Sequence, residues 1–340
     1  MLYFLTFLLI SISTSNNTHA NNLESIISKA INQHQEIKKI KHQINQYKAQ
    51  RIGSYGKFFP NLYLNQNKAK TENEISNQNE KTTVKIKEII LQQNIFNGGK
   101  DLNQITIDNL QIKFLQQKLI EKKTNINYQI YNILSQIFYL KKKLSNLQTQ
   151  HKTASQLLSL ETLNFRNLEA NNFDITKSKI TQLNTQSQIS QSQNEINIKL
   201  LDLKLLTDLD ITILNYSPSP LPQFLEYQKN YHKLLKNNLS LKMINIQLQI
   251  NRKTHLQNKQ NILPSADIEG KISKESNLFF YQNNNVKKKS LAVNIRVPIL
   301  SSLKNYSKIK QSSQNILLSE KNYKIRESKL SKELFLLIKK

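Results

Sequence analysis

The chain has 340 residues with 5 glycines, 6 prolines, no tryptophan and no cysteine. The absence of cysteine excludes disulfides, thiolate metal ligands and cysteine nucleophiles, and the scarcity of glycine and proline favours long uninterrupted helices. The formal net charge of +26 would suit a nucleic-acid partner. We expect no nucleic-acid binding, however, because the lysines and arginines are scattered along the chain and no stripe concentrates them.

The first twenty residues have the pattern of a signal peptide. An apolar run from Leu2 to Ile10 is followed by Thr18, His19 and Ala20, which end in the small residue that signal peptidase requires. We therefore predict a cleaved signal peptide over 1–20; an N-terminal membrane anchor or a buried helix are the alternatives. The apolar run is shorter than the ~20 residues that span a bilayer, and no later segment has about 18 consecutive apolar residues.

A long helix is predicted after Gly99, because no glycine or proline occurs between it and Pro218. Apolar residues recur there at every seventh position, which predicts helices that coil around neighbours. The series consists of Ile105, Ile112, Leu119, Ile126, Ile133, Leu140, Leu147 and Ala154. A helix over 102–165 would be roughly 95 Å long.

Shorter helices are predicted on both sides of the long one. An earlier helix begins near Leu23 and ends near Gly53, Gly56 and Pro60, which are residues typical of a helix end. A third helix is predicted over 174–209.

The chain also repeats itself at an offset of 204 residues. Pro60 matches Pro264 at this offset, and the apolar positions of the helices before these two prolines match as well. Such a shared register indicates a duplication. We predict a signal peptide over 1–20, a first repeat over 21–217, a proline-rich linker over 218–223 and a second, incomplete repeat over 224–340.

Strand patterns follow both matched prolines. Apolar residues alternate with charged or polar ones, as in a barrel whose apolar side chains face lipid and whose polar side chains face a wet lumen. The predicted lipid-facing positions are Ile268, Gly270, Ile272, Leu291, Val293, Ile295 and Val297. The first repeat gives a poorer copy, with Leu62 and Leu64, then Val84 and Ile86, and a change of phase near Glu88 that we interpret as a bulge. Four strands cannot close a barrel, since the smallest barrels have about 8, so this interpretation requires an oligomer.

This order of helices and strands resembles the TolC family of outer-membrane efflux proteins. The segments that carry the resemblance are Phe59-Pro60-Asn61-Leu62, Gln93-Asn94-Ile95-Phe96-Asn97-Gly98-Gly99 and Val297-Pro298-Ile299-Leu300, together with Phe165 and Asp174 nine residues later. The resemblance implies a mainly α fold of long antiparallel coiled helices, an α-barrel, with four strands contributed to a trimeric transmembrane β-barrel. It places helix–strand turns at Pro60, Gly98, Gly99, Pro264 and Pro298.

The resemblance also implies a location and partners. Such a homotrimer crosses the cell outer membrane, contacts its lipid and extends into the periplasm. There it docks through helical tips onto a periplasmic adaptor protein and an inner-membrane ABC or proton-driven pump. Phe165, Leu168 and Asp174 would form such a tip; an Asp that merely begins a helix is the alternative interpretation of Asp174.

Two departures from the family pattern concern these tips. Leu168 stands where the family commonly has glycine. The part of the second repeat that corresponds to 137–210 is missing, so the sequence has the pattern of a C-terminally truncated member, and no gating residue is assigned.

No catalytic chemistry is predicted. Gly98, Gly99, Lys100 and Asp101 fail the phosphate-loop pattern, and His34 and His42 lack a third metal ligand nearby. We therefore expect no enzyme activity, metal or cofactor, and interpret the chain as a passive conduit for efflux or type I protein secretion. The alternatives are a truncated remnant that does not assemble, and a cytoplasmic coiled-coil scaffold in which the strand patterns are accidental.

Overall fold

The computed structural model describes residues 24, 27–75, 78–167, 171–208, 235–279, 282–299 and 303–339. The predicted signal peptide over 1–20, the predicted linker over 218–223 and the tip residue Leu168 lie outside these residues.

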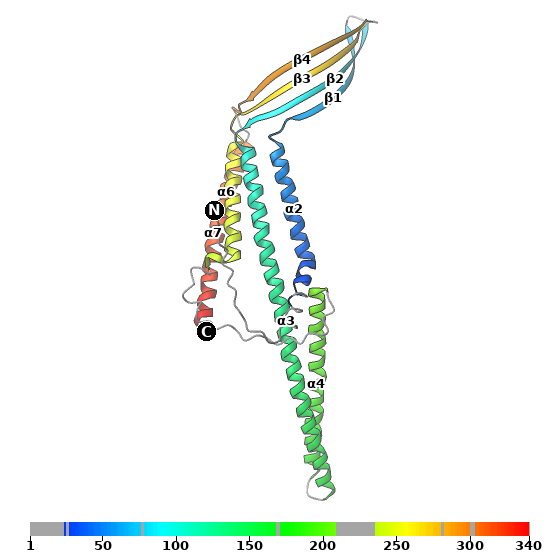
Figure 1. The fold of residues 1–340 in the computed structure, drawn as a ribbon, viewed down its shortest axis with the longest axis vertical. Helices are drawn as coiled ribbons and strands as arrows, with labels where there is room; N and C mark the ends of the chain where they lie inside the picture. Colours follow the sequence, from blue (N-terminus) through cyan, green and yellow to red (C-terminus); the bar gives the residue numbers. More distant parts are fainter. Residues whose placement is uncertain are drawn as a thin grey trace, which may run out of the picture. The chain divides into compact units, whose positions relative to one another are not determined.

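Long helices alternate with two strand pairs along the chain (Figure 1). The elements are α2 (Gln35–Gly56), β1 (Asn61–Ile75), β2 (Gln78–Asn97), α3 (Lys100–Arg166), α4 (Asn172–Thr207), α6 (Leu239–Gln260), β3 (Ser265–Phe279), β4 (Gln282–Arg296) and α7 (Leu303–Lys339). Helix α6 begins and ends 204 residues after α2, and β3 begins and ends 204 residues after β1. The division into repeats over 21–217 and 224–340 stays a prediction.

The chain forms two compact units. Residues 1–39 and 119–223 make up the first, and residues 40–118 and 224–340 make up the second. The chain passes from one unit to the other within α2 and α3, which are continuous across these boundaries.

The first unit has its core where α3 packs against α4 and the helical turns before Lys39. The most buried residues are Ile37, Ile126, Ile130 and Leu203, each 1 % exposed or less. Nearer the C-terminal end of α3, two hydrogen bonds join α3 to α4. Gln182 Nε2 of α4 donates to Ser155 Oγ of α3 at 3.0 Å, and a 3.1 Å hydrogen bond joins His151 Nδ1 of α3 to Thr185 Oγ1 of α4. Helix α3 confirms the helix predicted over 102–165, and six of the eight heptad positions are buried: Ile105, Ile112, Ile126, Leu140, Leu147 and Ala154.

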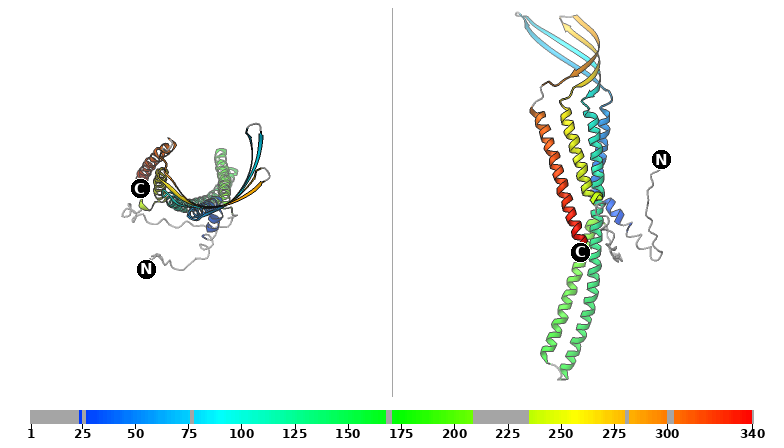
Figure 2. Two further views of the ribbon diagram at one scale, coloured as in Figure 1. Left: turned by 90° about the horizontal axis from the view of Figure 1, so that it is seen from above. Right: turned by 90° about the vertical axis from the view of Figure 1, so that its left-hand side faces the viewer.

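The second unit contains a four-stranded antiparallel sheet in the order β1-β2-β3-β4. The sheet is curved (Figure 2), and β1 and β4 are its two edges. The alternating residues over 266–273 lie in β3 and those over 291–296 in β4, so the strand patterns are not accidents of a helical scaffold.

The bulge predicted near Glu88 is wrong. Glu88 pairs regularly with Asn65 on one side and Ser273 on the other, and the register of β2 shifts instead between Asn94 and Phe96. The apolar pattern changes phase because β2 carries Ile86 on one face of the sheet and Ile89 on the other, while the backbone alternates without a break.

Helices α6 and α7 pack together in the second unit through a series of polar contacts. Asn251 Nδ2 donates to Ser319 Oγ at 2.6 Å, and Arg252 Nη2 lies 2.9 Å from Glu320 Oε1. Among the helices that the structure describes, none combines the length and the apolar composition needed to cross a membrane.

Candidate membrane-spanning surface

One face of the sheet gathers the predicted lipid-facing residues into cross-strand rows. The register places Leu62, Leu91, Gly270 and Leu291 side by side in one row, and Leu64, Ile89, Ile272 and Lys289 in the next. Val293 pairs with Ile268, and Ile295 with Ala266, so that they extend the same face toward the helices; Val297 follows β4 directly. We call this the apolar face of the sheet.

The apolar face is open to its surroundings. Leu64 is 78 % exposed, Leu291 79 % and Val293 63 %, so no other part of the described chain covers them. A shallow hollow of about 440 Å³ lies over Gly270, lined by Leu91, Ile272, Lys289 and Leu291 among others. Large apolar side chains in such numbers on one face indicate contact with lipid or with another protein.

The opposite face of the sheet, which we call the polar face, carries paired charges. Lys271 Nζ lies 2.6 Å from Glu88 Oε1, and Lys288 Nζ lies 3.2 Å from Glu275 Oε2. Asn294 donates from Nδ2 to Asp267 Oδ2 at 3.0 Å. Asp267 and Glu269 are two residues apart on β3 and therefore share this face. A polar lining of this kind suits a water-filled interior.

Glycines shape the turn from β2 into α3. Gly98 and Gly99 both have positive φ, +59° and +77°, where a side chain is strained. A Cβ on Gly98 would also lie 2.9 Å from the carbonyl oxygen of Gln260 and 2.9 Å from Leu263 Cβ. The α6–β3 connection therefore packs so closely against this turn that only glycine fits there.

The three predicted turn prolines lie at strand ends. Pro60 directly precedes β1, and Pro264 directly precedes β3. Pro298 follows the last residue of β4 by two positions. Their ring removes a backbone N–H and fixes φ, which suits the ends of strands.

The predicted tip is only partly described. Phe165 is 44 % exposed near the C-terminal end of α3. Asn171 is the N-cap of α4, where its Oδ1 accepts a hydrogen bond of 3.1 Å from the backbone N–H of Asp174. Asp174 thus stands in the first turn, where its charge favours the helix N-terminus, and the role of these residues in docking stays a prediction.

Sequence reasoning missed a buried carboxylate, Asp108. It is 0 % exposed and accepts hydrogen bonds from Ser54 Oγ at 2.6 Å, Gln50 Nε2 at 2.9 Å and Gln104 Nε2 at 2.9 Å. The available signal was its place seven residues before the apolar Leu115, on the helix face that Ile105 and Ile112 also occupy. Asp108 holds α2 against the start of α3 within the second unit.

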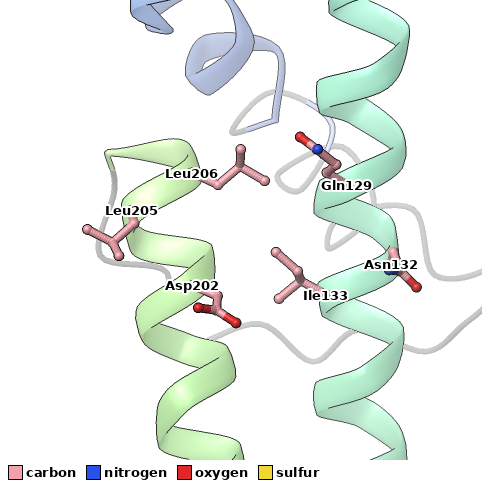
Figure 3. A pocket seen from close by; sticks show the side chains of 6 residues that line it. All are labelled: Gln129, Asn132, Ile133, Asp202, Leu205 and Leu206. Atoms are coloured by element: carbon pink, nitrogen blue, oxygen red, sulfur yellow. The ribbon is translucent and has the colours of Figure 1, made fainter.

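An open groove lies between α3 and α4 in the first unit (Figure 3). It has a volume of about 420 Å³ and is lined by Gln129, Asn132, Ile133, Asp202, Leu205 and Leu206. The Nζ atom of Lys199, one turn earlier on α4, lies 3.2 Å from Asp202 Oδ2. The lining is mostly apolar and amide, which does not define a catalytic constellation.

An ion pair links the start of α2 to α3 in the first unit. Glu36 accepts a hydrogen bond from Lys122, which lowers the pKa of the Glu36 carboxyl below its ordinary value of 4.5.

Among the described residues, no group of three or more His, Cys, Asp or Glu could hold a metal ion.

Comparisons with known proteins give a consistent fold. No family model and no curated protein matches the sequence. Among solved structures, CusC, described as forming a transmembrane channel, aligns with a TM-score of 0.77 at 15 % identity over 92 % of this chain and 74 % of its own. The outer membrane protein VceC of Vibrio cholerae aligns at 0.76 and 10 % identity over 91 % and 76 %. The outer membrane channel CmeC of Campylobacter jejuni aligns at 0.74 and 12 % identity over 95 % and 72 %. The chain has the fold of these proteins, which confirms the resemblance to TolC-type channels at the level of fold.

Proposed function

We propose that the chain is one subunit of a trimeric outer-membrane channel, a passive conduit with no catalytic site. The observation that carries the proposal is the open, two-faced sheet, with exposed apolar residues on one face and paired charges on the other. That combination fits a barrel strand layer with lipid on its apolar face and a water-filled interior on its polar face. The fold shared with CusC, VceC and CmeC supports the same function.

The two edges of the sheet support assembly. Strands β1 and β4 are each 15 residues long, and among the described strands each has a neighbour on one side only. Long unpaired edges favour pairing with another chain. In our proposal β4 of one subunit pairs with β1 of the next, and three sheets of four strands close into a twelve-stranded barrel.

Exposed apolar residues on the helices fit the same assembly. Leu318 and Ile325 on α7 are 61 % and 53 % exposed, and Ile198 and Leu205 on α4 are 57 % and 76 % exposed. These positions would be buried by neighbouring subunits in a closed helical tunnel. The tunnel would lie in the periplasm, where Phe165, Leu168 and Asp174 meet an adaptor protein and an inner-membrane ABC or proton-driven pump supplies the energy.

This function requires export, so the proposal includes cleavage of a signal peptide over 1–20. It includes efflux of small molecules or type I protein secretion as the transport task. The pump, not this chain, would carry out the energy-consuming step.

The test is the mass and the conductance of the purified full-length chain. We expect a trimer in detergent by native mass spectrometry, and stepwise increases in current when it is added to a planar lipid bilayer. A chain that remains monomeric in detergent and leaves the bilayer conductance unchanged would contradict the proposal.

A further inference from the structure

Seven lysines whose side chains the structure describes lie on the apolar face of the sheet, six of them beyond its apolar rows toward the hairpin ends and Lys289 in the last apolar row. They are Lys68 and Lys70 on β1, Lys85 and Lys87 on β2, Lys274 on β3, and Lys287 and Lys289 on β4. All seven side chains are exposed. Strand alternation puts them on the same side as Leu64 and Leu291.

Several of these lysines face one another directly across neighbouring strands. Lys87 pairs with Lys274, and Lys274 pairs with Lys287, so three like charges stand in one row. Lys68 pairs with Lys85 in the following row. Neighbouring strands are about 4.8 Å apart, and like charges directly opposite each other destabilise a sheet. An arrangement of this kind favours the binding of an anion.

The chain itself supplies no such anion among the sheet residues whose side chains the structure describes. The acidic residues there are Glu88, Asp267, Glu269 and Glu275, and all four lie on the polar face. The polar-face lysines Lys271 and Lys288 have carboxylate partners at 2.6 and 3.2 Å. Within the described part of the chain, no side-chain hydrogen bond or ion pair engages any of the seven lysines on the other face.

The position of the lysines indicates what the anion is attached to. The last apolar row consists of Leu64, Ile89, Ile272 and Lys289, and the next row consists of Gln66, Lys87, Lys274 and Lys287. Lys289 also lines the apolar hollow over Gly270. A ligand that fits both features has an apolar tail and an anionic head, in that order along the strands.

We propose that the lysine row, made of Lys87, Lys274 and Lys287, binds the phosphate groups of anionic lipid headgroups around the hairpin ends of the sheet. The inference rests on the proposed function, in which the apolar rows lie in the hydrocarbon of the membrane. Lysine ammonium groups bind phosphate oxygens as point charges, and each lysine near an anionic membrane surface adds to the attraction. The flexible lysine stems lie along the apolar surface while their ammonium groups reach the headgroup level.

The test measures the binding of fluorescent lipid A, a phosphorylated glycolipid, to the full-length chain in neutral detergent. The test variant is K87Q/K274Q/K287Q. The matched control is K152Q/K177Q/K179Q, which removes the same charge from exposed lysines of α3 and α4. We expect the affinity to fall by about tenfold or more in the test variant and by less than about twofold in the control.

Two further measurements do not depend on the folding of a glutamine variant. Lipid A without its phosphates is expected to bind the unaltered chain about tenfold more weakly than the phosphorylated form. K87R/K274R/K287R, which keeps the charge, is expected to bind within about threefold of the unaltered chain.

Equal binding of phosphorylated and dephosphorylated lipid A would overturn the inference, as would equal losses in the test and control variants. Displacement of lipid A by inorganic phosphate at the same concentration would show a site for free anions and would also overturn it. The lysine row lies within one chain, so binding is measurable whether or not trimers form. Failure to form a trimer would contradict the proposed function. A trimer that binds phosphorylated and dephosphorylated lipid A equally would contradict the lipid inference alone.

Discussion

Asp108 joins residues that lie far apart in the sequence. Ser54 and Gln50 come from α2, 54 and 58 residues before Asp108, and Gln104 comes from one turn earlier on α3. A heptad pattern predicts which face of a helix is buried, but it does not predict which polar residue of another helix lies opposite a buried position. This contact was therefore invisible in the sequence, although the burial of Ile105 and Ile112 around it was predicted.

Removing the Asp108 carboxylate is expected to destabilise the second unit. Asp108→Ala would leave the Ser54 hydroxyl and two glutamine amides without their acceptor, at a cost of about 2–4 kcal/mol in the free energy of unfolding. Asn109→Ala is the control, because the neighbouring Asn109 is exposed and its hydrogen bond with Arg51 lies at the surface. Urea unfolding followed by circular dichroism measures both variants. Equal stability of the two would show that the network around Asp108 does not hold the helices together.

At the scale of elements, local periodicity predicted most of the fold. The heptads predicted α3 within two residues at its start, and the polar–apolar alternation predicted β3 and β4. The third helix, predicted over 174–209, occurs as Asn172–Thr207, because Asn171 supplies the cap two residues earlier than expected. Helix bounds depend on such caps, which the apolar period does not contain.

Strand β2 shows where the period alone was insufficient. It carries apolar residues on one face near its hairpin end and on the other face near α3, a pattern that predicts a bulge at Glu88 where the strand has none. The pairing partners decide the backbone phase, and they belong to β1 and β3. The lysine row could not be predicted from the sequence for the same reason, because Lys87, Lys274 and Lys287 become neighbours only through the pairing register of the strands.

The two faces of β4 are expected to respond differently to the same substitution. Val293→Lys places a charge on the apolar face, and Ala292→Lys places it on the polar face one residue away; both native side chains are exposed. A lysine on a lipid-facing position near the middle of a barrel wall costs about 2–4 kcal/mol. Insertion into lipid vesicles, measured by flotation, should fall for Val293→Lys and stay near the unaltered level for Ala292→Lys. Equal insertion of the two variants would remove the distinction between the faces.

In the molecule as a whole, the described residues leave the apolar face of the sheet uncovered. The described residues provide long helices and four strands, and no part of them lies over Leu64, Leu291 or Val293. Three copies, twelve strands and a surrounding bilayer would bury these side chains and satisfy both sheet edges in the same step.

In the proposed channel, the apolar face of the sheet lies against lipid. The most direct measurement places single cysteines along residues 290–295 of β4 in the cysteine-free chain, labels each with a fluorophore and measures quenching by a lipid-soluble quencher in vesicles. We predict strong quenching at positions 291, 293 and 295 and weak quenching at 290, 292 and 294, a period of two residues. Uniform quenching, or none at any position, would show that the apolar face does not lie against lipid.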